Sequence, residues 1–406
     1  MHDRGGSGLR AIVAGGGIGG LAAALALSRA GWDVRVLEKS PAFSDIGAGL
    51  QLGPNVVKVL HHWGLREALA TLAAAPARLQ VISALSGELL ASLSLGPAMV
   101  QRYGAPYLTM HRADLHALLL HAVRQTDARL YLDRSVRHFD QSDASVTVQP
   151  TAPLALECDA LIGADGLWST VREQLLGDGS PRRTGHLAYR ALVPQTGLPD
   201  ALRSRDVTVW LGPSMHVVHY PVRGGDWLNL VAFVHGGLGE AAQDAQGWDL
   251  RASAADLRAG LGGACTALRD RIEAIDEWSR WVMYDRPPVR DSSQLARGRV
   301  ALLGDAAHPM RPYLAQGAGM AIEDAAALAR ALAHASPSGD DVANRLQGYA
   351  QQRWRRNARV QARALRNGQV FHADGLLRWG RDFSLKLLGS RLLDLPWLYG
   401  GGPDRR

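Results

Sequence analysis

The chain has 406 residues, of which 47% are hydrophobic and 20% are charged, and its formal net charge at pH 7 is +7. This composition is ordinary for a globular protein and excludes collagen-like, coiled-coil and wholly disordered chains. The length fits two domains, or one large domain with an inserted part.

Charge and cysteine content narrow the range of partners. The basic residues are nearly all arginines, and they are scattered rather than grouped with aromatic residues, which argues against a nucleic-acid partner. A basic surface of this kind attracts anionic small molecules. The two cysteines, Cys158 and Cys265, lie far apart without His or Cys neighbours at zinc spacing. We therefore expect a cytoplasmic protein with no metal site and no disulfide framework.

The first predicted elements form a strand–helix–strand unit. The patterns predict a short buried strand over 10–16, a helix over 18–30 and a second strand over 34–38. The apolar run 11–30 lies where a signal peptide would lie, but it carries five glycines and leads directly into the second strand. Because no other apolar run approaches the roughly 18 residues that span a bilayer, we expect no membrane span.

The rest of the chain alternates between helical and strand patterns. Helices are predicted over 55–69, 112–126, 254–275, 317–335 and 341–366. Strands are predicted over 79–95, over 130–139 and 145–149 as a hairpin, and over 159–163 and 299–303. Between 184 and 236 the chain is rich in strands, over 189–193, 207–211, 216–222 and 227–234. This region predicts a separate sheet inserted into an α/β domain.

A glycine motif, Gly15-x-Gly17-x-x-Gly20, lies between the first strand and the first helix. Gly15 permits a tight turn, Gly17 lets the backbone approach a pyrophosphate, and Gly20 lets helix and strand pack closely. The helix amino terminus adds N–H groups and a positive dipole. Glu38 closes the second strand 18 residues after Gly20, where an acid hydrogen-bonds a ribose diol and repels a 2′-phosphate. The site therefore predicts FAD or NAD rather than NADP.

Two later motifs place an acid after a buried strand. Asp165 ends the strand 159–163 and leads into a polar turn that contains Arg172, a pattern that also fits an Asp-capped helix start. Asp305 follows the strand 299–303, and Gly317 then begins a helix whose start can face an anion or an electron-rich ring. His308, in the same loop, is by itself typical of a structural histidine.

Taken in this order and at these distances, the motifs resemble one family, the single-component FAD-dependent aromatic hydroxylases, over residues 9–370. The resemblance implies an α/β fold, in which a Rossmann-like FAD-binding domain carries an inserted β-sheet substrate domain, as in p-hydroxybenzoate hydroxylase-like proteins. It implies a discontinuous FAD-binding domain over 9–75, 100–180 and 290–370, a substrate domain over 76–99 and 181–289, and a helical tail over 371–406.

The same resemblance implies cofactors and their ligands. FAD is bound tightly but not covalently, NADH is a transient cosubstrate with NADPH left open, and reduced flavin reacts with O₂ to a C4a-hydroperoxide that hydroxylates the substrate ring. Asp165 is associated with FAD and nicotinamide binding, Asp305 with the ribityl chain, and Arg112 with FAD. The residues predicted to bind the cofactor are Gly15, Gly17, Ile18, Gly20, Glu38, Lys39, Gln51, Arg112, Asp165, Asp305, Pro312, Gly317 and Ala318.

Within the family, the chain is most similar to the hydroxylases of salicylate, 3-hydroxybenzoate and 6-hydroxynicotinate. The likeness is carried by the segments 46–55, Tyr189-Arg190, His216-x-x-x-Tyr220-Pro221, Ala315-Gln316-Gly317 and Trp397–Gly400. In the 3-hydroxybenzoate type the His–Tyr pair and the loop glutamine line the substrate pocket. The resemblance therefore makes His216, Tyr220 and Gln316 the predicted catalytic residues and a small aromatic acid the predicted substrate.

Strand geometry agrees with this assignment. His216 and Tyr220 share one face of a strand, about 13 Å apart along it, and His219 points to the other face. A histidine of near-neutral pKa can accept a phenol proton, and the phenolate donates electron density to the ring. Core packing remains the alternative role for His216 and Tyr220.

At some positions this chain departs from the sequence patterns of these hydroxylases, so its substrate class is not decided by the resemblance. Gln51 replaces a histidine of the 6-hydroxynicotinate type and favours the benzoate types, but the loop from Tyr313 to Gly317 departs from the Pro-His-Gln-Gly of salicylate hydroxylases. A heteroaromatic substrate, such as a hydroxynicotinate or quinolone, and a flavin oxidase or reductase without ring hydroxylation stay as alternatives. The apolar stretch 376–398 either packs onto its own domain or contacts a membrane surface or a second subunit, as in a homodimer.

Overall fold

The computed structural model describes residues 8–43, 49–235 and 250–401. The chain forms two compact units, the first from 1–45, 113–182 and 285–364, and the second from 46–112, 183–284 and 365–406. Residues 49–75 and 100–112, which the sequence assigns to the FAD-binding domain, thus pack within the second unit. The division of the chain by function stays a prediction.

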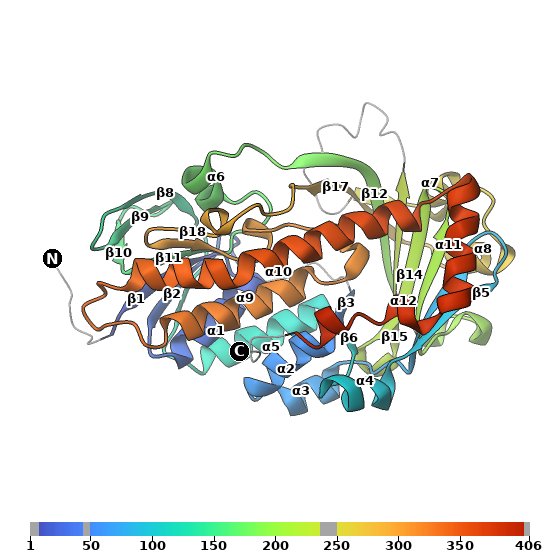
Figure 1. Ribbon diagram of the computed structural model, residues 1–406, viewed down its shortest axis with the longest axis horizontal. Helices are drawn as coiled ribbons and strands as arrows, with labels where there is room; N and C mark the ends of the chain where they lie inside the picture. The colour runs from blue at the N-terminus through green and yellow to red at the C-terminus, as the bar shows by residue number, and fades with distance from the viewer. Residues whose placement is uncertain (1–7, 44–48, 236–249, 402–406) are drawn as a thin grey trace. The chain divides into compact units, whose positions relative to one another are not determined.

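The first unit is built on a six-stranded sheet in the order β18-β19-β11-β1-β2-β7 (Figure 1). Its strands are β1 (Arg10–Ala14), β2 (Asp33–Leu37), β7 (Arg129–Tyr131), β11 (Ala160–Gly163), β18 (Ala296–Arg297) and β19 (Val300–Leu302). All neighbours are parallel except β18 and β19. The central strands are short, apolar and buried, as parallel strands are when both faces of a sheet are covered.

Helices and a small antiparallel sheet complete the first unit. Helices α1 (Ile18–Arg29) and α9 (Gly317–Leu332) lie side by side (Figure 1), and their small residues allow a close approach. The other elements are α5 (Arg112–Arg124), α6 (Thr170–Leu176), the first part of α10 (Val342–Phe371), and the antiparallel strands β8 (Val136–Gln141), β9 (Val146–Pro150) and β10 (Leu156–Cys158).

The predicted hairpin over 130–139 and 145–149 is partly wrong. β8 and β9 do form an antiparallel pair, but β7 instead joins the parallel sheet beside β2. Asp133 explains the division, because its φ of +53° lies in the left-handed region and ends the extended run between β7 and β8.

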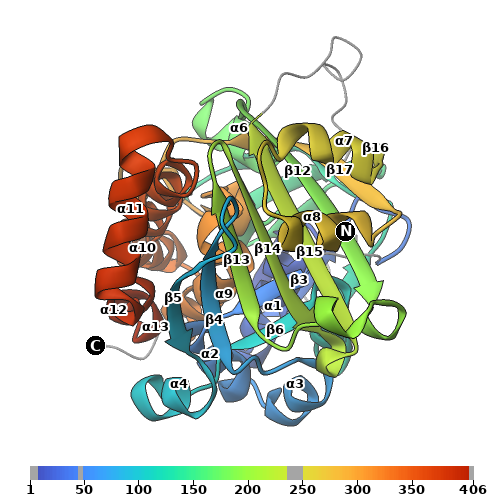
Figure 2. The same cartoon turned by 90° about the vertical axis from the view of Figure 1, so that its right-hand side faces the viewer.

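The second unit is built on an eight-stranded sheet in the order β16-β17-β12-β15-β14-β13-β4-β5 (Figure 2). Its strands are β4 (Arg78–Ser83), β5 (Leu89–Ser94), β12 (Arg182–Pro194), β13 (Val207–Gly212), β14 (Met215–Val222), β15 (Trp227–His235), β16 (Leu250–Ala252) and β17 (Trp278–Asp285). The predicted strand-rich insertion is confirmed, and the predicted strands over 79–95 join its edge as β4 and β5.

Helices α7 (Ala254–Gly260) and α8 (Thr266–Glu273) cover one face of this sheet (Figure 2). Their Leu257 and Leu268 share a core with Val217 of β14. The single helix predicted over 254–275 is wrong, because Gly262 adopts a φ of +54° and interrupts it.

The remaining elements of the second unit are a two-stranded sheet and short helices. They are β3 (Gly49–Leu52), β6 (Leu108–His111), α2 (Pro54–His62), α3 (Arg66–Leu72), α4 (Gly96–Tyr103), α11 (Gly375–Leu388), α12 (Ser390–Leu393) and α13 (Pro396–Tyr399). The helix predicted over 55–69 is divided between α2 and α3, since Gly64 takes a φ of +70°.

The carboxyl-terminal helices pack onto their own unit through one face. Leu385 of α11 joins a buried cluster with β4 and β5, and Asp394 accepts hydrogen bonds from Arg102 and Tyr103. The opposite face of α11 is apolar and exposed, with Leu376 90% accessible. No helix in the described ranges is long and apolar enough to cross a bilayer.

Candidate functional site

In the turn between β1 and α1, two glycines have no room for a side chain and a third faces open space. A Cβ atom at Gly15, whose φ is +104°, would lie 2.4 Å from the Ala164 oxygen, and one at Gly20 would lie 1.9 Å from the Gly15 oxygen. A Cβ at Gly17 would meet nothing within 4 Å. Helix α1 starts after Gly17 with no side-chain cap and no acid in its first turn. The helix start can therefore present its N–H groups to an anion.

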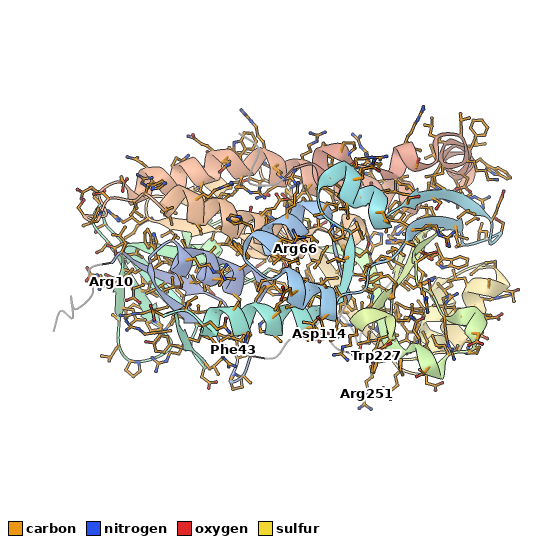
Figure 3. All side chains as sticks on the ribbon, turned by 90° about the horizontal axis from the view of Figure 1, so that it is seen from below. Arg10, Phe43, Arg66, Asp114, Trp227 and Arg251 are labelled. Carbon is orange, nitrogen blue, oxygen red and sulfur yellow. The ribbon has the colours of Figure 1, made fainter. Side chains whose placement is uncertain are left out.

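Glu38 stands directly beside this turn. Its Oε2 accepts a hydrogen bond from the Gly16 N–H at 2.6 Å, and its Oε1 accepts one from the Ser40 N–H at 2.8 Å. His116 of α5 lies 2.8 Å from the Gly16 oxygen, and Phe43 (Figure 3) packs beside its ring with centroids 6.2 Å apart. The carboxylate is thus held next to the glycine turn, where a dinucleotide site needs an acidic side chain to accept from the ribose hydroxyls.

The three sequence motifs come together in the first unit. The Cβ position of Gly15 lies 3.0 Å from the Cα of Asp165 in the second motif. The Cβ position of Gly19 lies 3.0 Å from Leu303 and 3.3 Å from Ala321, which flank the third motif. Residues far apart in sequence therefore border one turn, as a dinucleotide site requires.

The predicted Asp cap is only partly right, because the N-cap residue of α6 is Ser169, whose side chain accepts from the Arg172 N–H, and Asp165 supports it from four residues earlier. Its carboxylate accepts hydrogen bonds from the Ser169 hydroxyl and from the Val171 N–H, the latter at 3.2 Å, at the start of α6. Burial raises the pKa of Asp165 above its usual value, against the effect of these hydrogen bonds. A role toward a cofactor stays a prediction.

Arg172 connects the second motif to the third. Its Nη1 donates to the carbonyl oxygens of Ala306 at 3.0 Å and Ala307 at 2.5 Å, and its Nε donates to Asp178 at 3.0 Å. These carbonyls belong to the turn that contains Asp305, whose side chain is exposed while its neighbours are buried. Arg172 therefore fixes the turn from which Asp305 projects, a contact that the sequence did not reveal.

A buried ionic cluster also supports the turn that contains Asp305. His308 Nε2 pairs with Asp324 of α9, and Arg353 of α10 donates to Asp324 at 2.7 Å and to Glu323 at 2.9 Å. Burial alone would raise the pKa of Asp324, but its interactions with His308 and Arg353 outweigh burial and lower that pKa. His308 is thus structural, as its pattern indicated. The one sequence signal for the cluster was two adjacent acids inside an otherwise apolar helix.

The start of α9 is a second open helix end. Ala315 lies in the left-handed region with φ +51°, which costs a non-glycine residue about 1 kcal/mol. The helix then begins after Gln316 with no side-chain cap and no acid in its first turn. A Cβ at Gly317 would meet nothing within 4 Å. Pro312 is exposed and Ala318 half-buried, so this helix start can face a ligand.

These features fit a flavin dinucleotide. Two open helix starts, at Gly17 and Gly317, can receive a pyrophosphate and the negative charge of a reduced ring. Glu38 and Asp305 have carboxylates that can accept from ribose and ribityl hydroxyls, and this role stays a prediction. Ile18 begins α1 as a buried residue, and Lys39 is exposed beside Glu38. Within the described ranges, no group of His, Cys, Asp and Glu residues could hold a metal ion.

In the second unit, β14 presents His216 and Tyr220 on one face. Both are buried, with 1% and 4% of their surfaces accessible. Val217, on the other face, packs in the core beneath α7 and α8, and His219 on that face accepts a hydrogen bond from the Trp210 indole at 3.3 Å. The predicted division of the strand into two faces is confirmed.

Tyr220 lies in a polar cluster. Tyr107 donates to Gln51 Oε1 at 2.6 Å, and Gln51 is also hydrogen-bonded to Tyr220. Burial raises the pKa of Tyr220 well above its usual value and outweighs Gln51 and the positive charge of Arg190. Burial likewise raises the pKa of Tyr107. Both phenols therefore remain protonated hydrogen-bond donors at neutral pH.

His216 is enclosed by aromatic rings and a second histidine. Phe233 stacks on it with centroids 4.6 Å apart, and Phe371 meets it edge-on at 5.3 Å. Its Nδ1 lies 2.7 Å from Nε2 of His372. Burial, followed by His372 and His186, lowers the pKa of His216 well below its usual value, so the ring is neutral at neutral pH. The near-neutral pKa expected from the sequence is therefore wrong, because strand parity does not report how deeply a side chain is buried. Sequence analysis missed His372, which follows a long helix and belongs to no motif.

The predicted site residues divide between the two units. His216, Tyr220, Gln51 and Arg112 belong to the second unit, and Arg112 is the first residue of α5. Gln316, which is buried, and the other predicted cofactor residues belong to the first unit. Residues 46–48 of the segment that carried the family likeness lie outside the described residues.

Comparison with known proteins decides the family. The model of a family described as FAD binding domain matches residues 9–364. The chain belongs to this family. A 3-hydroxybenzoate 6-hydroxylase of Polaromonas naphthalenivorans is 39% identical over 396 residues, which are 97% of this chain and 96% of that protein. A 6-hydroxynicotinate 3-monooxygenase of Bordetella bronchiseptica is 37% identical over 353 residues, which are 87% of this chain and 89% of that protein.

A solved structure has the same fold. Klebsiella pneumoniae HpxO, complexed with FAD and uric acid, superimposes with a TM-score of 0.82 at 29% identity, over 95% of this chain and 94% of that chain. The predicted family and the α/β fold class are confirmed. The chain is a FAD-dependent aromatic-ring monooxygenase.

Proposed function

We propose that this FAD-binding monooxygenase hydroxylates a phenolic aromatic acid of the 3-hydroxybenzoate or salicylate type, with NADH as the electron donor. The observation that carries the proposal is the buried pair His216 and Tyr220 on one face of β14, a neutral imidazole and a protonated phenol. The 39% identical relative is named for 3-hydroxybenzoate, which supports the benzoate type.

Within this proposal, the first unit holds the cofactor. FAD held there would supply the activation of O₂, with electrons from NADH. The N–H groups at the start of α1 bind the pyrophosphate, and Glu38 accepts from the adenosine ribose. Asp305 would accept from the ribityl hydroxyls, and the N–H groups at Gly317 and Ala318 would stabilise negative charge on the flavin ring. Arg172 and the His308 cluster keep this turn in place.

The second unit prepares the substrate ring. His216 accepts the proton of the substrate phenol, which makes the ring electron-rich enough for electrophilic attack. Tyr220 keeps its own proton, because burial holds the pKa of Tyr220 far above neutrality, and it donates a hydrogen bond to a substrate oxygen. The aromatic rings around His216 exclude water from the proton transfer.

The proposal is tested by NADH oxidation. FAD-loaded protein is mixed with NADH, O₂ and one of a panel of phenolic and heteroaromatic acids, and each product is identified by mass. We expect 3-hydroxybenzoate or salicylate to stimulate NADH oxidation and to yield a product heavier by one oxygen atom. The variant His216→Gln should lose about a hundredfold of this rate, and His138→Gln, an exposed histidine in the first unit, should lose none.

A heteroaromatic acid is the second candidate substrate. The relative named 6-hydroxynicotinate 3-monooxygenase and the HpxO complex with uric acid both favour it. Stimulation by a hydroxynicotinate but by no benzoate would replace the first candidate with the second. NADH consumption that yields only hydrogen peroxide with every acid would instead favour a flavin oxidase.

A further inference from the structure

Three histidines from separate segments of the second unit form a hydrogen-bonded row. Nδ1 of His216, on β14, lies 2.7 Å from Nε2 of His372, which follows α10. Nδ1 of His372 lies 3.2 Å from Nε2 of His186 on β12. Nδ1 of His186 lies 3.0 Å from the backbone oxygen of Thr184, the last member of the row among the described residues.

Packing fixes the rings in this order. The centroids of His216 and His372 are 5.0 Å apart, as are those of His372 and His186. The backbone oxygen of His372 accepts a hydrogen bond from the Ser214 N–H at 3.2 Å, which ties it to the start of β14. Exposure rises along the row, because His216 is 1% accessible and the other two rings are half-buried. The row thus runs from a buried position toward solvent.

We propose that His372 and His186 act as a relay that makes Nε2 the basic nitrogen of His216 and takes up the proton that His216 accepts. The proposal rests on the proposed function of His216 as the acceptor of a phenol proton. His372 and His186 are positioning residues in this scheme, since they act on the substrate through His216.

The direction of the row follows from its last acceptor. The Thr184 oxygen can only accept, so Nδ1 of His186 carries a hydrogen and, in a neutral ring, its Nε2 carries the lone pair. Nδ1 of His372 must then donate to that lone pair, which leaves Nε2 of His372 as an acceptor. His216 therefore donates from Nδ1 and holds its own lone pair on Nε2. The opposite tautomers would place two lone pairs 3.0 Å apart at Thr184.

The relay balances as a series of proton transfers. The phenol O–H bond breaks and an N–H bond forms at Nε2 of His216, while its Nδ1 proton passes to Nε2 of His372. The Nδ1 proton of His372 passes in turn to Nε2 of His186, which then carries both protons and the positive charge. Return of the proton along the same path restores the starting tautomers.

Burial explains why a relay is useful. A fully buried imidazole cannot hold a positive charge without a large desolvation cost, and burial keeps the pKa of His216 well below its usual value. His186 is only half-buried, and beyond it lies the exposed His235, whose ring meets that of His186 edge-on at 5.1 Å. A charge that leaves His216 along the row therefore moves toward water.

The tautomer of His216 is measured directly by long-range ¹H–¹⁵N correlation spectra of FAD-loaded protein labelled with ¹⁵N-histidine. Spectra of His216→Gln and His372→Gln assign the signals by their loss. We expect the Nδ1 shift of His216 to be that of a protonated nitrogen and the Nε2 shift to be that of a nitrogen with a lone pair. The reverse pattern would overturn the relay. This measurement needs no turnover, so it stands whether or not the proposed reaction is correct.

A matched pair of variants tests the functional consequence. His372→Gln keeps a side-chain oxygen that can accept from Nδ1 of His216, whereas His372→Leu does not. With 3-hydroxybenzoate as the probe, we expect both variants to lose at least tenfold in kcat with little change in KM or FAD affinity, because neither side chain can take up a proton, while only His372→Gln keeps the tautomer of His216. Equal kcat for wild type and His372→Leu would overturn the relay. Failure of wild-type protein to hydroxylate any acid would instead refute the proposed function, and the ¹⁵N shifts would still decide the tautomer.

Discussion

Two glycines of one turn should respond in opposite ways to the same added methyl group. Gly20 lies inside α1, and a Cβ there would lie 1.9 Å from the Gly15 oxygen, about 1 Å closer than the 3.0 Å below which real Cβ contacts essentially do not occur. Gly17 has φ −74° and ψ −175°, which alanine adopts readily, and its Cβ would meet nothing within 4 Å. The variants Gly20→Ala and Gly17→Ala therefore separate folding from cofactor binding.

The magnitudes follow from the same geometry. For Gly20→Ala, the gain in helix propensity is about 1 kcal/mol, but relieving the overlap moves backbone and costs roughly 3 kcal/mol or more. We expect a net loss of about 2 kcal/mol or more in the free energy of unfolding. Gly17→Ala should leave that free energy within about 0.5 kcal/mol of wild type. Its methyl group would displace a pyrophosphate from one or two charge-assisted hydrogen bonds, which corresponds to a ten- to hundredfold rise in the Kd for FAD.

Two measurements on each variant check this expectation. Urea unfolding of the apoprotein is followed by the fluorescence of its 11 tryptophans, and FAD affinity is obtained by titration of flavin fluorescence. Wild-type FAD affinity in Gly17→Ala would refute the assignment of the α1 start as the pyrophosphate site. Wild-type stability in Gly20→Ala would refute the close approach of Gly20 to the turn.

Three further predictions test other parts of the molecule. The folded pKa of His216 is depressed, so the unfolded chain binds more protons than the folded chain as pH falls below about 6.5. The free energy of unfolding should therefore fall below that pH, by up to about 1.4 kcal/mol per pH unit. Urea unfolding of His216→Gln between pH 7 and 5 should show a smaller dependence of this free energy on pH than wild type, and an unchanged dependence would contradict the prediction. Arg353→Met should lower the free energy of unfolding by about 3–5 kcal/mol, because it removes the buried guanidinium that two buried acids share. Arg345→Met, on the same helix but in a partly exposed pair, should cost at most about 1 kcal/mol; similar losses from the two variants would refute the buried cluster as a support. Glu38→Gln should weaken FAD binding about tenfold in the flavin titration, through one charge-assisted hydrogen bond to ribose, and unchanged affinity would place the ribose elsewhere.

Local pattern was enough to predict the parts of the fold that depend on short-range physics. The alternation of β14 correctly placed His216 and Tyr220 on one face, because side-chain direction on a strand depends only on parity. The glycine spacing of the first turn was informative for a similar reason, because local geometry decides whether a Cβ atom fits at each position. Helix ends were less predictable, and two helices were divided where Gly64 and Gly262 take left-handed conformations.

Contacts between distant segments could not be predicted from one sequence. His372 follows His216 by 156 residues, and no spacing rule relates a strand to the residue after a helix in another part of the chain. Arg172 likewise reaches two backbone carbonyls more than 130 residues away, and backbone acceptors leave no trace in side-chain identity. These tertiary contacts set the surroundings of the predicted residues, so the sequence indicated candidate groups but not the partners that shift their pKa values.

The central claim is that this chain inserts one atom of O₂ into an aromatic ring. Turnover of FAD-loaded protein with NADH and 3-hydroxybenzoate under ¹⁸O₂ in ordinary water tests it most directly, with the product examined by mass spectrometry. We expect one ¹⁸O atom in the ring product and an equal consumption of NADH. A product that carries only oxygen from water, or NADH oxidation that gives labelled hydrogen peroxide and no ring product with any acid in the panel, would contradict the claim.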